Sequence, residues 1–242
     1  MKKILLLSGT ARAGTSSLVN ILNLHNHILM GQDRYFYPFQ NNTIRAGDFE
    51  KDRFLDVREG DTHPQGGLKP RNVEPARRYD NAVYIGDKFA PLFRHLGHVF
   101  EQFPDAQHIY ILRNPLSVVE SYDARFRDPE DNWNLDWRAG LKAWNDSVRT
   151  VAALTEERLA RFLFVQYEEI FASPKALNAL FTRLGLSNLE EERLAPFTTR
   201  FRNLSEQSVA RREDLRVAVA READWDSYRI LSRHMPNIGI SQ

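Results

Sequence analysis

A glycine-rich loop close to the N-terminus carries the clearest chemical signal in the sequence. Residues 4–22 read ILLLSGTARAGTSSLVNIL, and Gly9 and Gly14 stand where a Walker A loop, G-x-x-x-x-G-K-[ST], has its glycines. Thr15 takes the place of the Walker lysine, and the only cation inside the loop is Arg12. A glycine turn between a strand and a helix directs backbone N–H groups and the positive end of the helix dipole at one point. The loop is therefore predicted to bind an oxyanion.

The side chains around the loop add to this prediction. Thr15, Ser16 and Ser17 offer hydroxyl groups at the start of the predicted helix, and Arg12 offers a planar fork of donors with a fixed charge. The alternative is an ordinary turn that needs glycine for its geometry alone. The missing lysine weakens the case for ATP or GTP, because in nucleoside triphosphatases that lysine reaches the β and γ phosphates.

A second possible anion site follows a predicted strand in the middle of the chain. In IYILRNPLSVVESYDARF, Arg113 leaves the strand and Pro115 is suited to open a helix. Ser121 lies eight residues after Arg113, roughly two turns into that helix. The alternative is a solvated arginine and an ordinary helix serine. Nucleotide hydrolases usually end a later strand in an aspartate that orders Mg²⁺, so Arg113 indicates a second anion rather than a metal.

The elements that must position these residues are those of an α/β protein with a largely parallel sheet, because short apolar runs alternate with helix-periodic segments. Four runs are short and apolar on both faces, as expected for covered strands: 3–8, 82–86, 108–112 and 161–167. Helix-periodic apolar positions occur at 92–103 and 137–151. A helix is predicted at 174–184, between an N-cap serine and a glycine stop, and a capping box at 187–190 predicts a further short helix.

Length and composition limit the possible domain organisation and partners of the chain. The 242 residues predict one domain, 1–242, with a charged, Gly- and Pro-rich loop insertion at about 41–81, and loops of that length are usually functional or mobile. The balance of 33 basic and 32 acidic residues provides no overall field to attract nucleic acid or an anionic membrane. The chain has no cysteine, which excludes disulfides and cysteine nucleophiles. The apolar start is too short for a signal peptide, and no run approaches the roughly 20 residues that span a bilayer, so a soluble, cytoplasmic protein is expected.

Taken together, the two anion-site stretches resemble the sulfotransferases that use 3′-phosphoadenosine 5′-phosphosulfate (PAPS). In that family a first loop, [KR]-x-G-T-[ST], binds the 5′-phosphosulfate, and a strand-end R-x-P-x(5)-S binds the 3′-phosphate. Residues 12–16 and 113–121 match these two motifs. The segments GDKFAPLFRHLGHVFEQFPDAQHIYILRNP and FVQYEEIFASPKALNALFTRLGL are similar to later parts of the family. The resemblance covers about 1–39 and 83–186.

The resemblance implies a P-loop-like three-layer fold, with a central, mostly parallel β-sheet flanked by helices. PAPS is the implied donor, with no metal required, and the acceptor is a carbohydrate or small molecule. The contacts to the acceptor are expected largely from the 41–81 insertion and the C-terminal region. The implied donor-binding residues are Arg12, Ala13, Gly14, Thr15, Ser16 and Ser17 in the loop, and Arg113 and Ser121 for the 3′-phosphate. Cytosolic members often have an adenine-stacking tryptophan where Ser17 stands, so this chain looks closer to the bacterial and carbohydrate-type branch, and its adenine contacts stay unassigned.

The catalytic residues implied by the resemblance are Arg12, Asp33 and Lys88. Asp33 follows a run similar to the one that delivers the catalytic carboxylate in carbohydrate sulfotransferases, and Lys88 would lie near the sulfate. Their alternatives are a surface aspartate that caps a turn and a solvated lysine. Histidine is the second choice of base, from His25, His27, His95, His98 and His108, although a structural role is the first interpretation of all five. Arg211 and Arg212 are further candidates for the 3′-phosphate.

Two other functions remain open on the sequence. One is a divergent P-loop kinase of a small molecule, against which the missing Walker lysine argues. The other is a noncatalytic module that binds a nucleotide or another anion. The oligomeric state is unknown.

Overall fold

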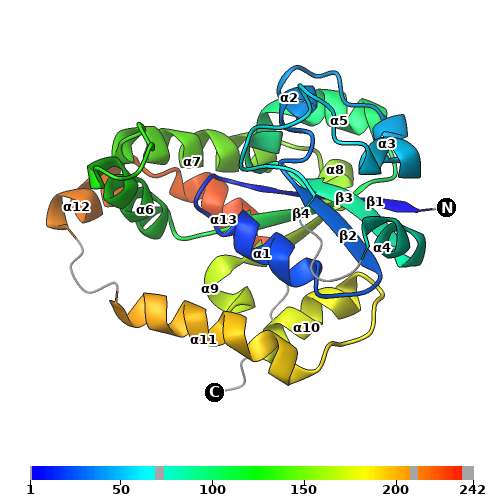
Figure 1. Ribbon diagram of the computed structural model, residues 1–242. Helices are drawn as coiled ribbons and strands as arrows, with labels where there is room; N and C mark the ends of the chain where they lie inside the picture. The colour runs from blue at the N-terminus through cyan, green and yellow to red at the C-terminus, as the bar shows by residue number, and fades with distance from the viewer. Residues whose placement is uncertain (1, 69–73, 208–211, 236–242) are drawn as a thin grey trace. The chain divides into compact units, whose positions relative to one another are not determined.

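The computed structural model describes residues 2–68, 74–207 and 212–235 (Figure 1). Its strands are β1 (Lys3–Gly9), β2 (Ile28–Gln32), β3 (Tyr84–Lys88), β4 (Gln107–Leu112) and β5 (Phe162–Gln166). They form one sheet in the order β2-β3-β1-β4-β5, and β3 pairs in parallel with both β1 and β2. The chain therefore has the predicted α/β architecture, a parallel central sheet flanked by helices.

Contacts divide the chain into two compact units. The first comprises 1–9, 15–110 and 157–163, and the second comprises 10–14, 111–156 and 164–242. In the first unit the helices are α1 (Thr15–Leu22), α2 (Phe36–Gln40), η1 (Ala46–Phe49), α3 (Lys51–Leu55), α4 (Pro75–Asn81), η2 (Ala90–His95) and α5 (Leu96–Gln102), and α8 (Glu156–Leu159) ends there. In the second they are α6 (Pro115–Arg127), α7 (Trp137–Ala152), α9 (Tyr167–Ile170), α10 (Pro174–Arg183), α11 (Glu191–Gln207), α12 (Glu213–Glu222) and α13 (Trp225–Arg233).

The four predicted strands all form, as β1, β3, β4 and β5, but the sequence missed β2. The run that forms β2, ILMGQ, is short and contains a glycine, which lowers strand propensity. It pairs with β3 along its whole length, with Ile28 opposite Tyr84 and Gln32 opposite Lys88. Tertiary pairing therefore makes a strand where the local sequence is ambiguous.

The segment at 41–81 is not the continuous loop that was expected. It contains η1, α3 and α4, and it contributes Ile44, Phe49, Phe54 and Tyr79 to the core of the first unit. Tyr35 and Phe89 belong to the same core. The buried aromatic residues of this segment are isolated among charged and polar residues, so they show no helical period in the sequence. Burial of single large side chains orders the segment.

Helix α7 packs against both α6 and α13 in the second unit. Figure 1 shows α6 running beside α7, and Gly140 allows this approach because a Cβ there would lie 2.7 Å from Cγ of Tyr122. Trp144 of α7 is fully buried and stacks on Tyr228 of α13, with ring centroids 5.9 Å apart. The predicted helix at 174–184 is α10. The short helix expected after 187 begins at Glu191 instead, and α11 has 17 residues.

Candidate active site

The glycine-rich loop and the start of α6 meet within the second unit. Arg12 Nε lies 3.1 Å from Ser121 Oγ, and Nη1 of Arg113 donates to the carbonyl oxygen of Arg12 at 2.7 Å. The backbone at Arg12 has a φ of 70°, in the left-handed region, which an arginine adopts only when its surroundings impose it. The structure thus brings Arg12 together with Arg113 and Ser121, two predicted donor-binding residues that lie 101 and 109 positions further along the chain.

Tyr167 and Trp144 hold Arg113 in place, and neither role is predictable from the sequence. The guanidinium carbon of Arg113 lies 4.1 Å from the centre of the Tyr167 ring, and Trp144 Nε1 donates to the Arg113 carbonyl at 2.9 Å. The same tyrosine ring packs on Gly14, which has a φ of 94°. A Cβ at Gly14 would lie 2.4 Å from both Cδ2 and Cε2 of that ring. Glycine is therefore required there for conformation and for space.

The positive charges around Arg12 favour the binding of an anion. Partial burial, then the neighbouring guanidinium groups of Arg125 and Arg113, lower the pKa of Arg12. Arg125 is itself paired with Asp131 at 2.5 Å and lies over the Trp133 ring. Nε of Arg113 is buried and has no hydrogen-bond partner among the described residues. Clustered cations and a buried, unpaired N–H group are stabilised by a bound anion.

The other predicted loop residues contribute in different ways. The N–H of Ala13 donates to the carbonyl of Thr10 at 3.0 Å, so it closes the turn of the loop. Thr15 is buried at the start of α1, while Ser17 is exposed. Ser16 Oγ accepts a hydrogen bond from Gln32 Nε2 at 3.2 Å, which ties α1 to the end of β2 inside the first unit.

Asp33 and Lys88 form the second group, in the first unit. Asp33 directly follows β2, Lys88 ends β3, and the two strands are parallel neighbours, so both side chains arise at the same edge of the sheet. Nζ of Lys88 lies 2.5 Å from Oδ2 of Asp33, with side-chain exposures of 5% and 15%. Asp33 has a φ of 52°, and its N–H donates to the Lys88 carbonyl at 2.8 Å. A carboxylate and an ammonium group are therefore held together beside two strand ends.

Asp87, which the sequence analysis did not single out, fixes the turn that carries Asp33. Its carboxylate accepts backbone N–H groups of Arg34 at 3.0 Å, Tyr35 at 2.8 Å and Lys88 at 2.9 Å. Burial, then repulsion from Asp33, raises the pKa of Asp87 to about 7, although the hydrogen bonds from Tyr35 and Arg34 act to lower it. Because it accepts three backbone hydrogen bonds and is 1% exposed, Asp87 supports the geometry of the turn.

The next residue in that turn anchors the 41–81 segment. Arg34 is fully buried, and its Nη1 lies 2.5 Å from Oδ2 of Asp61. Arg53 pairs with the same carboxylate. Burial acts to raise the pKa of Asp61, but hydrogen bonds from Arg53, from the N–H of Arg58 and from Arg34 lower it to about 2. The segment is therefore tied to the position beside Asp33 by a buried network of charges.

His63 is the histidine that lies beside the candidate base, and the sequence analysis passed over it. Its Nε2 is 3.8 Å from Oδ2 of Asp33. The histidines considered from the sequence have other surroundings: His108 is fully buried and its pKa is lowered to about 3, first by burial and then by Arg161. His95 and His98 bind Asn42 and the Ile44 carbonyl. His25 and His27 contact one another at the end of α1.

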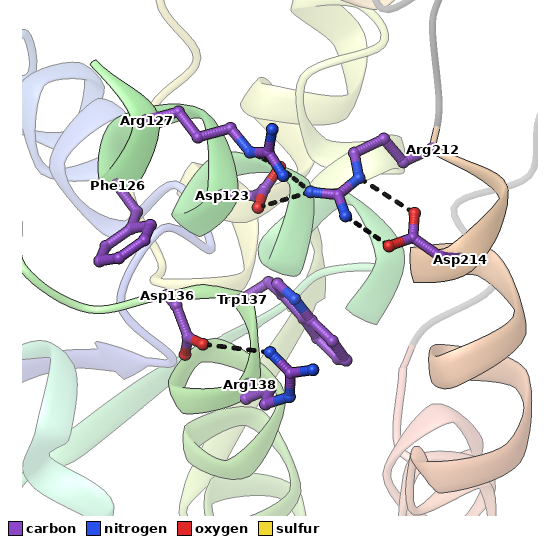
Figure 2. Close-up of a pocket in the computed structure, with 8 residues that line it drawn as sticks. All are labelled: Asp123, Phe126, Arg127, Asp136, Trp137, Arg138, Arg212 and Asp214. Carbon is purple, nitrogen blue, oxygen red and sulfur yellow. Dashed lines mark hydrogen bonds and ion pairs between the residues drawn. The ribbon is translucent and has the colours of Figure 1, made fainter. Parts of the chain in front are cut away.

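Arg212 has carboxylate partners in the structure, and Arg211 lies outside the described residues. Nη1 of Arg212 lies 3.0 Å from Oδ2 of Asp123, and its Nε lies 3.0 Å from Oδ1 of Asp214 (Figure 2). These residues line a cavity of about 270 Å³ whose other walls are Phe126, Arg127, Asp136, Trp137 and Arg138. Arg212 therefore joins the start of α12 to α6.

Comparison with known proteins agrees with these motifs. The sequence model of the sulfotransferase family matches residues 5–191. The chain belongs to the sulfotransferase family. No curated protein is a significant match to the chain.

A solved sulfotransferase shares the fold of this chain, and others are similar to it in structure. A sulfotransferase from Alicyclobacillus acidocaldarius is 17% identical, with 98% of this chain and 97% of that chain covered and a TM-score of 0.57. A sulfotransferase domain from the curacin biosynthetic pathway is 19% identical, with 78% and 76% covered and a TM-score of 0.49. Mouse sulfotransferase SULT7A1, complexed with PAP, is 16% identical, with 87% and 68% covered and a TM-score of 0.46. The P-loop-like α/β fold of this sulfotransferase is thus confirmed. Within the part of the chain that the structure describes, no helix combines the length and the apolar character needed to cross a bilayer.

Proposed function

We propose that the chain transfers a sulfuryl group from PAPS to a hydroxyl group of a carbohydrate or small-molecule acceptor, with an amine as the less favoured acceptor. The observation that carries this proposal is the meeting of Arg12, Arg113 and Ser121, with an Nε–H on Arg113 that lacks a partner among the described residues. A guanidinium group held by a stacked ring and a backbone contact is suited to a phosphate.

The residues present fit a donor that is phosphorylated at two places. The glycine turn and the hydroxyl groups of Thr15 and Ser16 provide donors for a 5′-phosphosulfate at the start of α1. Arg113 and Ser121 provide donors for a 3′-phosphate, and Arg12 contacts both of these residues. When bound, PAPS supplies a sulfuryl group on a good leaving group.

Asp33 and Lys88 are assigned to the acceptor side of the reaction. Asp33 takes the proton of the acceptor hydroxyl on a carboxylate oxygen, as a general base. Lys88 provides a positive charge where the oxygens of the transferred sulfate carry negative charge. Their ion pair at 2.5 Å keeps both side chains extended from adjacent strand ends before a substrate binds.

Calorimetric titration with adenosine 3′,5′-bisphosphate (PAP), the spent donor, tests the proposal. The wild-type chain should bind it more tightly than AMP, which lacks the 3′-phosphate. Arg113→Ala should weaken PAP binding by roughly 10- to 150-fold, the equivalent of one lost charged hydrogen bond. Arg138→Ala is the matched control, because this arginine is 73% exposed and lies outside the loop group.

Each outcome separates the proposal from its competitors. Equal affinity for PAP and AMP would refute the 3′-phosphate site. Mg²⁺-dependent binding of ATP in preference to PAP would support a kinase instead. Tight PAP binding without release of PAP from PAPS, for a panel of sugars, alcohols and amines, would point to a noncatalytic nucleotide-binding module.

A further inference from the structure

We propose that His63 is a positioning residue for Asp33, and that it acts in the neutral form that carries its proton on Nε2. In this role the Nε2–H group donates to the carboxylate that takes the acceptor's proton. The inference rests on the proposed function, in which Asp33 is the general base. The resemblance to sulfotransferases gave His63 no role, and the inference comes from its contacts in the structure.

The hydrogen bond at the other ring nitrogen of His63, Nδ1, determines the tautomer. The backbone N–H of Gln65 donates to Nδ1 of His63 at 3.2 Å. A backbone N–H group can only donate, so Nδ1 must carry a lone pair. In a neutral imidazole the proton is then on Nε2. That is the nitrogen that lies 3.8 Å from Oδ2 of Asp33.

The segment around His63 is fastened to the turn that carries Asp33. Oγ1 of Thr62 donates to the backbone carbonyl of Asp33. The N–H of Gly66 donates to the His63 carbonyl at 2.9 Å, and the imidazole packs edge-on against the Phe36 ring at 4.9 Å. These contacts restrict the ring and keep Nε2 on the side of Asp33, 3.8 Å from Oδ2. Hydrogen bonds at active sites are often long before substrates bind.

Asp33 needs a second hydrogen-bond donor because its first partner, Lys88, must also contact the transferred sulfate. The side chain of Asp33 faces Lys88 at 2.5 Å and His63 at 3.8 Å, both at Oδ2. The buried carboxylate of Asp87 is a third charged group beside it, and it repels Asp33. When Lys88 turns its ammonium group to the transferred sulfate, the carboxylate loses that ion pair. His63 Nε2–H is then the donor that keeps Asp33 oriented. His63 is 27% exposed and Lys88 only 5%, so the histidine lies on the more open side of the carboxylate.

Two substitutions distinguish a role of His63 in positioning Asp33 from a role in supporting its own loop through Gln65. His63→Gln places its amide group close to where Nε2 lies, whereas the shorter amide of His63→Asn reaches only as far as Nδ1. The first measurement is kcat and KM for release of PAP from PAPS with water as the acceptor. His63→Ala and His63→Asn should lower kcat by about 10- to 100-fold with an unchanged KM for PAPS. His63→Gln should recover most of the rate. Recovery by His63→Asn and not by His63→Gln would show that the bond to Gln65 matters, and would refute the proposal.

The second measurement does not depend on turnover. The ¹⁵N spectrum of histidine-labelled protein reports which ring nitrogen carries the proton, and the His63 signals are identified by their loss in His63→Gln. At neutral pH we expect protonated Nε2 and unprotonated Nδ1. Asp33→Asn should shift the Nε2 signal, and Asp52→Asn, which changes an exposed carboxylate on α3, should not.

The two proposals can fail separately. A proton on Nδ1, or an Nε2 signal that does not shift in Asp33→Asn, would overturn the role of His63 even if PAP binds as expected. Failure of the wild-type chain to bind PAP would overturn the proposed function, and the spectrum would then still decide whether His63 and Asp33 form a pair.

Discussion

Replacing Gly14 by alanine should damage both the stability of the second unit and its affinity for PAP. The added Cβ meets two problems at once. The residue would keep a φ of 94°, which side chains with a Cβ rarely adopt, and the Cβ would lie 2.4 Å from two carbons of the Tyr167 ring. That ring carries the guanidinium group of Arg113 at 4.1 Å. The disturbance should therefore pass from the loop to the proposed 3′-phosphate site.

The size of each effect can be estimated from the structure. A left-handed backbone costs a residue with a Cβ about 1–2 kcal/mol, and overpacking costs about 1–3 kcal/mol, so the free energy of unfolding should fall by about 2–5 kcal/mol. Displacing Tyr167 removes a cation–π contact worth about 0.5–2 kcal/mol to the position of Arg113. The affinity for PAP should then drop by about 2- to 30-fold.

Gly185 provides a matched control for this substitution. It has a φ of 72°, and a Cβ there would meet no atom within 4 Å, so Gly185→Ala carries the backbone cost alone. Urea denaturation and calorimetric titration of PAP should show a loss of about 1–2 kcal/mol for Gly185→Ala with unchanged affinity. In a Tyr167→Ala background, Gly14→Ala should lose its steric cost. If Gly14→Ala and Gly185→Ala behave alike in both assays, Tyr167 does not link the loop to Arg113.

Three further outcomes are expected. Ser121→Ala removes the hydroxyl group that contacts Arg12 at 3.1 Å, and should weaken PAP binding in calorimetry by about 2- to 12-fold; an unchanged affinity would exclude Ser121 from the site. Asp33→Asn should lower the rate of PAP release from PAPS by about 10²- to 10⁴-fold with unchanged PAP binding, and a rate like wild type would exclude it as the base. The pKa of Asp61 is lowered from 3.8 to about 2, so the charged form stabilises the fold above about pH 4 and this contribution is lost as the pH falls through 2. Acid titration of the unfolding free energy should therefore show a loss of roughly 2 kcal/mol over that range that Asp61→Asn lacks.

The candidate anion-binding loop could be predicted from sequence because its chemistry depends on local spacing. Two glycines, a cation and hydroxyl groups between a strand and a helix predict an anion site whatever the rest of the chain does. Arg113 and Ser121 are likewise separated by a strand end and two helical turns, which fix their relation in advance. Four strands were predicted correctly because each is a short apolar run covered on both faces.

The parts that the sequence could not predict depend on residues distant along the chain. Tyr167 is separated from Arg113 by more than fifty positions, so its role in holding the guanidinium group becomes visible only when β5 and α9 are in place. Likewise, Arg212 is a free cation in the sequence, and its partner Asp123 lies 89 positions away. In each case the spacing contains no period that would bring the two residues together.

The surroundings of Asp33 depend on both the local sequence and the tertiary structure. The sequence by itself, through its resemblance to the sulfotransferases, predicted a catalytic carboxylate at Asp33 and a lysine at Lys88. Only the tertiary structure decided that β2 and β3 are parallel neighbours, which places Lys88 at 2.5 Å and His63 at 3.8 Å from the same oxygen. The physical reason is that pairing between strands and burial of single aromatic side chains act over long separations in sequence, whereas glycine turns, helix starts and strand runs are set by neighbours.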